Sequence, residues 1–241
     1  MEGDKPCRFI LWKRIFEVLS RRNRLERDMR MKYKGVIFDL DGVVCHTDRY
    51  HYYAWKELAD SLGIYFDETI NNRFRGVSRE ACMEILLEGY KDTISDAEKS
   101  MLTEKKNDLY RDLLKNLSSK DLGIDVKGTL DKLKEKGTRL AIGSSSKNAM
   151  FILGQLGIKD YFNAVSDGNN ISKSKPDPEV FLKAAAFMGL SSSECLVVED
   201  ARAGIEAANR GGFDSVGIGE AASYEWATYK INKFSDILNI I

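Results

Sequence analysis

The chain has 241 residues, of which 43% are hydrophobic and 10% aromatic, which is enough for a sizeable core and unlike a disordered chain. Its 37 Lys and Arg residues balance 37 Asp and Glu residues, so the net charge gives no general attraction to nucleic acid. No apolar run approaches the roughly 18 residues needed to cross a bilayer. The cysteines include no C-x-x-C pair, which is typical of reduced thiols: Cys7, Cys45, Cys82 and Cys195. We therefore expect a cytoplasmic protein without a transmembrane segment or a nucleic-acid partner.

The N-terminal arm differs in charge from the rest of the chain. Residues 1–34 carry 11 Lys and Arg residues against 5 Asp and Glu residues, a net charge of +6. Apolar residues recur at helical spacing among the basic ones: Leu11, Trp12, Ile15, Phe16 and Leu19. This pattern predicts a basic amphipathic helix that contacts a membrane surface or a partner. Met31 stands directly before the first predicted strand, which favours interpreting residues 1–30 as an accessory or non-native extension.

The stretch from Val36 to Val43 predicts a buried strand followed by two acidic side chains that could take part in catalysis. Three apolar, β-prone residues run into Asp39 and Asp41, and Gly42 then ends the pattern. Alternation along the strand points both acids to the same side. Ligand sites in open parallel sheets lie at this carboxyl edge. The same letters also make an ordinary strand-ending turn.

The next segment, residues 49–117, is predicted to be helical. Trp55, Leu58 and Leu62 lie on one apolar helix face that Gly63 ends, and further periodic runs follow. Strand-like runs are scarce in this segment. We therefore expect a helical cap domain inserted after the first strand.

From residue 118 onward, predicted strands alternate with predicted helices. The strands are expected over 139–142, 162–165, 196–198 and 215–218, and the helices over 129–136, 149–156, 178–188 and 203–209. This alternation indicates a parallel sheet that helices cover on both faces. The expected fold is therefore α/β: a doubly wound, Rossmann-like parallel-sheet core from residues 31–48 and 118–241, with the cap domain at 49–117.

Polar side chains collect at three predicted strand ends. They are Asp39 and Asp41, then Ser144, Ser145 and Ser146, then Glu199 and Asp200. In a parallel sheet all three strand ends project from one edge, where four acids repel one another unless a cation is present. Hard oxygen ligands with retained water suit Mg²⁺. Lys175, which alone would be taken for a solvated loop lysine, can add positive charge at the same edge.

This combination is what phosphoryl transfer from a monoester requires. The metal and the lysine neutralise the phosphoryl oxygens, while hydroxyl and backbone N–H groups hold the phosphate. One carboxylate attacks to form an aspartyl-phosphate, and the other moves the proton of the ester oxygen.

The order of the motifs resembles the haloacid-dehalogenase-like hydrolase superfamily. The motifs are Asp39-Leu40-Asp41-Gly42-Val43, Ser144, Lys175-Pro176-Asp177-Pro178, and Glu199-Asp200 followed by Ala203-Gly204-Ile205. The resemblance implies that Asp39 is the nucleophile, that Asp41 is the general acid/base, and that Ser144 and Lys175 bind phosphate. It also implies one Mg²⁺ held by Asp39, the Asp41 backbone carbonyl and Asp200. Glu199 would be either a ligand or a carboxylate that orients the ligands.

Within the superfamily the chain is most similar to the β-phosphoglucomutase family. The matching pieces are Tyr50-His51, Ala54-Trp55-Lys56, Arg75-Gly76-Val77-Ser78-Arg79-Glu80, Lys106-Asn107-Asp108 and Ser144-Ser145-Ser146-Lys147-Asn148. The resemblance implies that His51 positions the acid/base and couples it to cap closure. The distal phosphate and the sugar would meet Thr47, Trp55, Arg75, Gly76, Val77, Ser78, Arg79, Lys106, Ser144, Ser145, Ser146, Lys147, Asn148 and Lys175.

Several of these residues also have purely structural interpretations. Arg75 and Arg79 would suit a solvated helix face, and His51 and Trp55 would suit a packed cap core. Ser144 and its neighbours would suit the cap of the following helix, a geometry that also binds phosphate.

The resemblance implies a Mg²⁺-dependent isomerase that interconverts β-D-glucose 1-phosphate and glucose 6-phosphate through an aspartyl-phosphate. A hexose 1,6-bisphosphate would be the activating intermediate, the substrate a small phosphosugar, and the protein a monomer. The alternative is a sugar-phosphate phosphatase of the same superfamily. A non-catalytic binding protein on this scaffold is less favoured, because it has no need to keep both Asp39 and Asp41.

Overall fold

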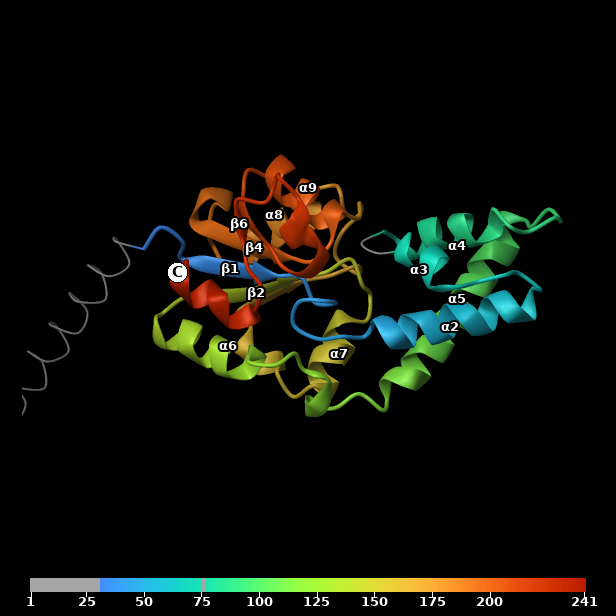
Figure 1. The fold of residues 1–241 in the computed structure, drawn as a ribbon, viewed down its shortest axis with the longest axis horizontal. Helices are drawn as coiled ribbons and strands as arrows, with labels where there is room; N and C mark the ends of the chain where they lie inside the picture. Colours follow the sequence, from blue (N-terminus) through green and yellow to red (C-terminus); the bar gives the residue numbers. More distant parts are fainter. Residues whose placement is uncertain (1–30, 75–76) are drawn as a thin grey trace, which may run out of the picture.

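The computed structural model describes residues 31–74 and 77–241, and within them a parallel sheet forms the centre of the larger lobe (Figure 1). Its strands are β1 (Gly35–Phe38), β2 (Arg139–Gly143), β3 (Ala164–Ser166), β4 (Cys195–Glu199), β5 (Asp214–Gly217) and β6 (Tyr229–Lys230). They lie in the order β3-β2-β1-β4-β5-β6, and every neighbouring pair is parallel. β1 therefore lies between β2 and β4, which brings the ends of these three strands together.

Helices cover both faces of this sheet, as Figure 1 shows. The α-helices of this lobe are α6 (Val126–Glu135), α7 (Ala149–Gln155), α8 (Glu179–Phe187) and α9 (Arg202–Arg210). Short 3₁₀ helices complete it: η1 (Ser119–Asp121), η2 (Lys159–Tyr161), η3 (Ser192–Glu194), η4 (Gly219–Ser223) and η5 (Phe234–Asn239).

Alternation along the strands divides the core into two layers. Val36 and Phe38 of β1 share one buried cluster with residues of α6, α7 and η5, whereas Ile37 belongs to a second cluster with residues of α8 and α9. Strands buried on both faces are the reason that the central segments read as continuous apolar runs rather than as alternating ones.

The cap follows β1 directly and consists of helices. They are α2 (Asp48–Ser61), α3 (Glu68–Asn72), α4 (Arg79–Leu87) and α5 (Asp96–Leu114). The cap has its own buried apolar cluster around Trp55, Phe74 and Met83. Figure 1 shows these helices gathered beyond the end of the sheet to which β1 points.

Two connections join the cap to the sheet lobe, and they lie side by side. Cys45 in the first forms an isolated β-bridge with Leu122 in the second. Arg49 and Asp121 form an ion pair between the same two segments. The two covalent connections between the cap and the core therefore run through one narrow region.

The predicted fold class is confirmed, because the sheet is parallel and doubly wound and the helical cap follows its first strand. β6 escaped prediction because its two residues are too few to show an alternating pattern. The domain boundaries at 49–117 remain a prediction, and residues 1–30 lie outside the described residues. None of the helices described is both long and apolar enough to span a bilayer.

We predict that Leu130→Ala lowers the free energy of unfolding by about 2–5 kcal/mol, because Leu130 of α6 is fully buried beneath the sheet. The exposed Lys132 on the same helix is the control, and Lys132→Ala should change stability by less than about 0.5 kcal/mol. Chemical denaturation of both variants checks this. Equal losses in the two would contradict the packing described here.

Candidate active site

A cavity of about 400 Å³ is lined by residues of both the sheet edge and the cap. Many of the predicted site residues line it: Asp39, Asp41, His51, Trp55, Val77, Ser78, Arg79, Lys106, Ser144, Ser145, Ser146, Lys147, Asn148, Lys175, Glu199 and Asp200. Thr47 does not line it but hydrogen-bonds to Asp41, which does. Arg75 and Gly76 lie outside the described residues.

Lys175 links two of the strand ends at the floor of the cavity. Its ammonium donates to Asp39 Oδ1 and, at 2.5 Å, to Glu199 Oε1. The side chains are almost fully buried, with exposed fractions of 3% for Lys175, 11% for Asp39 and 1% for Glu199. Burial lowers the pKa of Lys175, but the two carboxylates outweigh it and raise that pKa above its ordinary value. The lysine therefore carries a fixed positive charge beside Asp39.

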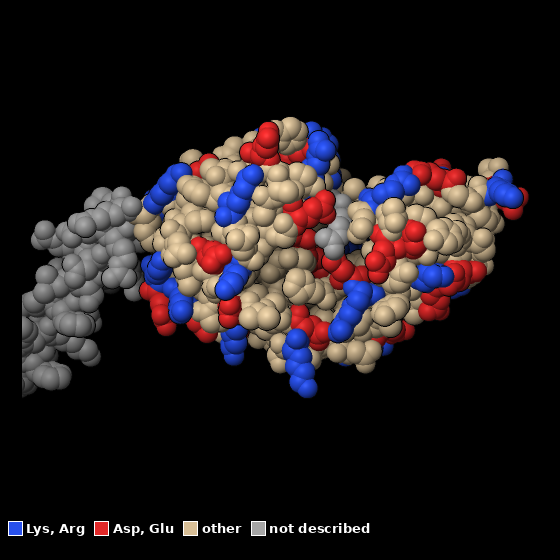
Figure 2. All heavy atoms as spheres, in the orientation of Figure 1, with Lys and Arg blue, Asp and Glu red and all other residues tan. Residues whose placement is uncertain are grey.

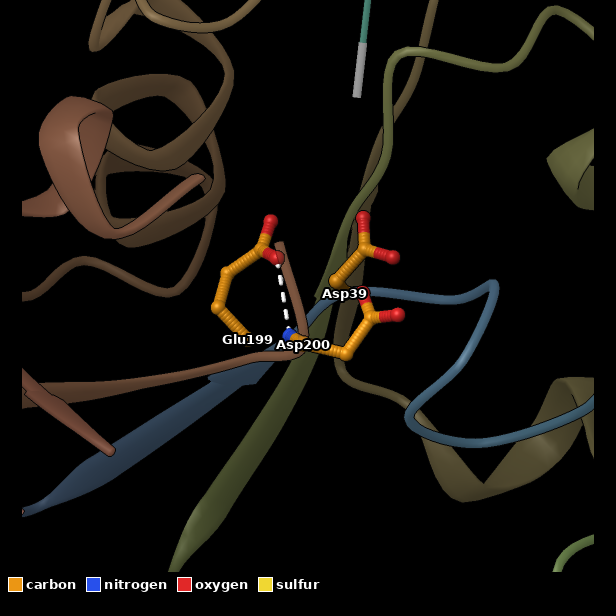
Figure 3. A group of neighbouring side chains, drawn as sticks. All are labelled: Asp39, Glu199 and Asp200. Carbon is orange, nitrogen blue, oxygen red and sulfur yellow. Dashed lines mark hydrogen bonds between the residues drawn. The ribbon is translucent and has the colours of Figure 1, made fainter. Parts of the chain in front are cut away.

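Both carboxylate oxygens of Glu199 accept hydrogen bonds that hold the site together. While Oε1 accepts from Lys175, Oε2 accepts from the backbone N–H groups of Asp200 and Ala201, each at 3.0 Å. Figure 3 shows the bond to Asp200. Burial pushes the pKa of Glu199 upward, and the Lys175 ammonium opposes this shift. Gly204 makes the arrangement possible, since a Cβ there would lie 1.9 Å from Glu199 Oε1.

Gly42 has a comparable role for Asp200. Its φ of +85° lies in the region that favours glycine, and a Cβ at this position would lie 2.1 Å from Asp200 Oδ2. The turn after β1 therefore packs directly against the end of β4. This contact explains why a glycine stands immediately after the Asp39-Leu40-Asp41 run.

The donor set at this edge fits Mg²⁺. One carboxylate oxygen each from Asp39, Glu199 and Asp200 lies within 4.8 Å of the others. Figure 3 shows the carboxyl groups of Asp39 and Asp200 beside each other at the ends of β1 and β4. Both oxygens of Glu199 and Oδ1 of Asp39 also accept hydrogen bonds, so the candidate ion site is built into the same polar cluster as Lys175. An all-oxygen site of this kind is what Mg²⁺ prefers.

Asp41 lies in a chain of hydrogen bonds that begins in the cap. Tyr110 of α5 donates to Thr47 Oγ1 at 3.2 Å, and Thr47 donates to Asp41 Oδ1. Burial, and then the charge of Asp39, raise the pKa of Asp41 well above its usual range. This shift favours the protonated form of the carboxyl group, which is the form that a general acid uses.

His51 and Lys106 form a buried pair on the cap side. Lys106 Nζ lies 3.0 Å from His51 Nδ1, and the His51 ring stacks on Tyr110 with a centroid distance of 3.9 Å. Burial, and then the Lys106 charge, lower the pKa of His51 well below its ordinary value, so the imidazole is neutral at pH 7. Burial lowers the pKa of Lys106 to about 7.

The other predicted cap residues divide between packing and lining roles. Trp55 is only 2% exposed and packs edge-on against Phe74, while Lys106 Nζ lies 4.7 Å from its ring centre. Ser78 caps α4 by accepting from the Ala81 N–H at 3.2 Å. Arg79, the first residue of α4, is partly buried, and that burial lowers its pKa.

The loop after β2 is tightly built from its own serines. Ser144 Oγ accepts from the Ser146 N–H, and Ser146 Oγ accepts from the Asn148 N–H, each at 3.2 Å. Ser145 Oγ is buried without a hydrogen-bond partner among the described residues. A buried hydroxyl left in this way costs free energy that a bound phosphate oxygen would recover.

Two residues important to the site escaped the sequence reasoning as functional candidates. Tyr110 and Asn107 both line the cavity. Tyr110 contacts Thr47 and His51, and Asn107 forms a hydrogen bond with Asn148. Tyr110 lies four residues after Lys106, which places the two on one helix face. This spacing is the feature of the sequence that could have indicated a role for Tyr110 beside Lys106.

A comparison with protein-family models matches residues 33–212 to the haloacid dehalogenase-like hydrolases. The chain belongs to this family, and the expected superfamily resemblance is confirmed. The match spans both sides of the cavity, from the strand that carries Asp39 to the helix that follows Asp200.

Within the family, the chain is similar to β-phosphoglucomutases. It is 40% identical over 206 residues to β-phosphoglucomutase of Bacillus subtilis, covering 85% of this chain and 91% of the relative. A crystal structure of β-phosphoglucomutase from Clostridium difficile has a TM-score of 0.80 at 34% identity, covering 85% of this chain and 93% of that one. A phosphorylated carbohydrates phosphatase of Thermotoga maritima is 29% identical over 187 residues, covering 76% of this chain and 83% of the relative.

The surface charge around the cavity is mixed rather than uniformly basic. On the face drawn in Figure 2, acidic side chains gather on both sides of the boundary between the lobes, with Lys and Arg residues interspersed over the rest. The Lys175 ammonium and the Lys106 amine are buried within the site instead.

We predict that Lys106→Met raises the free energy of unfolding by a few kcal/mol near pH 7, because the folded protein disfavours the charged amine that the unfolded chain retains. Since the unfolded state binds more protons above about pH 7, wild-type stability should rise with pH. The advantage of the variant should therefore shrink by roughly 1 kcal/mol per pH unit between about pH 7.5 and 9.5.

Urea denaturation of both proteins across this range measures the effect. Lys105→Met, at an exposed neighbour on α5, is the control for replacing a lysine of this helix by methionine. A constant difference between wild type and Lys106→Met would contradict the lowered pKa.

Proposed function

We propose that the protein is a Mg²⁺-dependent phosphosugar mutase that interconverts β-D-glucose 1-phosphate and glucose 6-phosphate. The observation that carries the proposal is a single cavity with two kinds of anion-binding chemistry. Asp39 and Lys175 lie on the core side, and Arg79 and Lys106 lie on the cap side. A sugar with phosphate at both ends needs two such regions, and the likeness to β-phosphoglucomutases supports the same assignment.

In the proposed reaction, phosphorylated Asp39 first gives its phosphoryl group to the free hydroxyl of the substrate. The acyl-phosphate P–O bond breaks, the new ester P–O bond forms, and Asp41 takes the hydroxyl proton. The resulting hexose 1,6-bisphosphate then reorients, and Asp39 attacks its other phosphorus. The second ester P–O bond breaks, and Asp41 returns the proton to the departing oxygen.

The residues around these two acids supply charge and position. Lys175 neutralises phosphoryl oxygens next to Asp39, and the hydroxyls of Ser144 and Ser145 are available to bind them. Bound Mg²⁺ would supply further charge neutralisation at the phosphoryl group. Arg79 would bind the phosphate at the far end of the sugar.

In the proposed mutase, closure of the cap would exclude water from the site. The path from Tyr110 through Thr47 to Asp41 links the cap to the general acid/base, and His51 stacks on the same tyrosine. A bound hexose that closes the cap would therefore exclude water and set the position of Asp41 in one movement. Such exclusion protects an aspartyl-phosphate from hydrolysis.

The second candidate is a sugar-phosphate phosphatase, favoured by the likeness to the Thermotoga maritima phosphatase. It would use the same nucleophile and acid/base, with water accepting the phosphoryl group from Asp39. We propose a cytoplasmic monomer in either case, in keeping with the reduced, unpaired cysteines in the described residues.

One experiment separates the two candidates. The protein is supplied with β-D-glucose 1-phosphate, Mg²⁺ and a catalytic amount of glucose 1,6-bisphosphate, and both glucose 6-phosphate and inorganic phosphate are monitored. A mutase forms glucose 6-phosphate without stoichiometric phosphate, and EDTA abolishes the reaction. Phosphate released in step with substrate loss would identify the phosphatase instead.

We predict that Asp41→Asn lowers kcat by about 10²- to 10⁴-fold without loss of folding, because the amide cannot exchange a proton with the ester oxygen. Asp108→Asn, at an exposed position of α5, should retain full activity. Steady-state kinetics and thermal unfolding of both variants check this. Near-normal turnover by Asp41→Asn would remove Asp41 from the mechanism.

A further inference from the structure

One cross-lobe contact at the cavity wall has no assigned role. Asn148 Nδ2, from the loop that precedes α7, donates to Asn107 Oδ1 of cap helix α5 at 2.9 Å. Both residues line the cavity, and Asn148 is only 8% exposed. The bond therefore joins the cap to the proposed phosphate-binding loop inside the site itself.

The Asn148 side chain bonds to the cap and not to its own helix. It is the N-cap residue of α7, where an asparagine ordinarily accepts a hydrogen bond from a backbone N–H of the first turn. Its side chain makes no such capping bond. The carboxamide points across the lobe boundary, where its Nδ2 donates to Asn107.

Two further side-chain contacts join α5 to α7. Further along, the Arg111 guanidinium lies 5.8 Å from the Phe151 ring centre, and Gln155 Nε2 lies 3.5 Å from the Leu114 carbonyl oxygen. The α5 residues 107, 111 and 114 recur at three- and four-residue spacing, and so do the N-cap residue 148 and the α7 residues 151 and 155. Each set therefore forms one stripe, and side chains connect the two stripes at these three points.

Asn107 also lies next to Lys106, and the two side chains reach different partners. Lys106 contacts His51 within the cap, whereas Asn107 reaches Asn148 in the core. Consecutive residues of a helix are about 100° apart, so this single turn of α5 holds both contacts. A hydrogen bond that holds Asn107 against the core therefore also sets the position of Lys106 in the cavity wall.

We propose that Asn107 is a positioning residue that holds Asn148 and sets α5 at its place over the loop of residues 144–148 when the cap closes on substrate. The inference rests on the proposed function, since it assumes a phosphosugar that contacts both lobes. A small phosphoester that occupies the core side alone does not need this alignment. Loss of the Asn107 side chain should therefore affect the two kinds of substrate differently.

The test compares wild type, Asn107→Ala and the matched control Asn116→Ala. Asn116 is an exposed asparagine whose side chain bonds to the Leu113 carbonyl at the end of the same helix. We expect Asn107→Ala to raise KM for the hexose phosphate about fivefold, as the loss of one neutral hydrogen bond would. Hydrolysis of p-nitrophenyl phosphate should stay within about twofold of wild type, and Asn116→Ala should change neither.

A double-mutant cycle with Asn148→Ala separates positioning from a general structural role. We expect the double variant to be no worse than Asn148→Ala alone, because the shared bond is then already lost. Additive effects, equal losses on both substrates, or an unchanged KM in Asn107→Ala would each overturn the inference. Asn107→Ser replaces Asn107→Ala if thermal unfolding shows that the alanine variant does not fold.

The test of Asn107 can be interpreted whether or not the protein is a mutase. If wild type releases phosphate from hexose phosphates instead of isomerising them, the mutase proposal fails. The KM for that hydrolysis then serves as the readout, and the same comparison of Asn107→Ala with Asn116→Ala still decides the role of Asn107.

Discussion

The site depends on the buried ammonium of Lys175, held between the carboxylates of Asp39 and Glu199. Three separate segments supply these groups, and burying any one charge without its partners would be strongly unfavourable. The pairing therefore fixes how the end of β1, the end of β4 and the loop before α8 approach one another. It also leaves a positive charge beside a carboxylate, which is the local chemistry that a phosphoryl group requires.

The cap contacts the core at two further places near this buried ion cluster. Through Tyr110 and Thr47 it reaches Asp41, and through Asn107 it reaches the loop that ends in Asn148. These polar contacts meet the core from different positions along α5, while Tyr110 also packs in the main core cluster. A movement of this helix would therefore displace both Asp41, the proposed acid/base, and the proposed phosphate-binding loop, and in the proposed mutase substrate size would govern proton transfer in this way.

Much of this arrangement could be predicted because it depends on short-range pattern. Apolar runs that end in acids located β1 and β4, and a parallel sheet necessarily brings such ends to one edge. The engagement of both Glu199 oxygens, the path from Tyr110 and the bond from Asn107 could not be predicted. The bonds from Lys175 to Glu199, from Tyr110 to Thr47 and between Asn148 and Asn107 join residues tens of positions apart, and tertiary packing sets these partners, which residue spacing does not encode.

The central claim is that phosphoryl transfer passes through Asp39. The most direct measurement is to react the protein briefly with Mg²⁺ and glucose 1,6-bisphosphate, quench with acid, reduce any acyl phosphate with borohydride and locate the altered residue by mass spectrometry. The account predicts modification at Asp39 alone. Modification at Asp41 or another carboxylate, or turnover that proceeds with no acyl phosphate at any position, would contradict it.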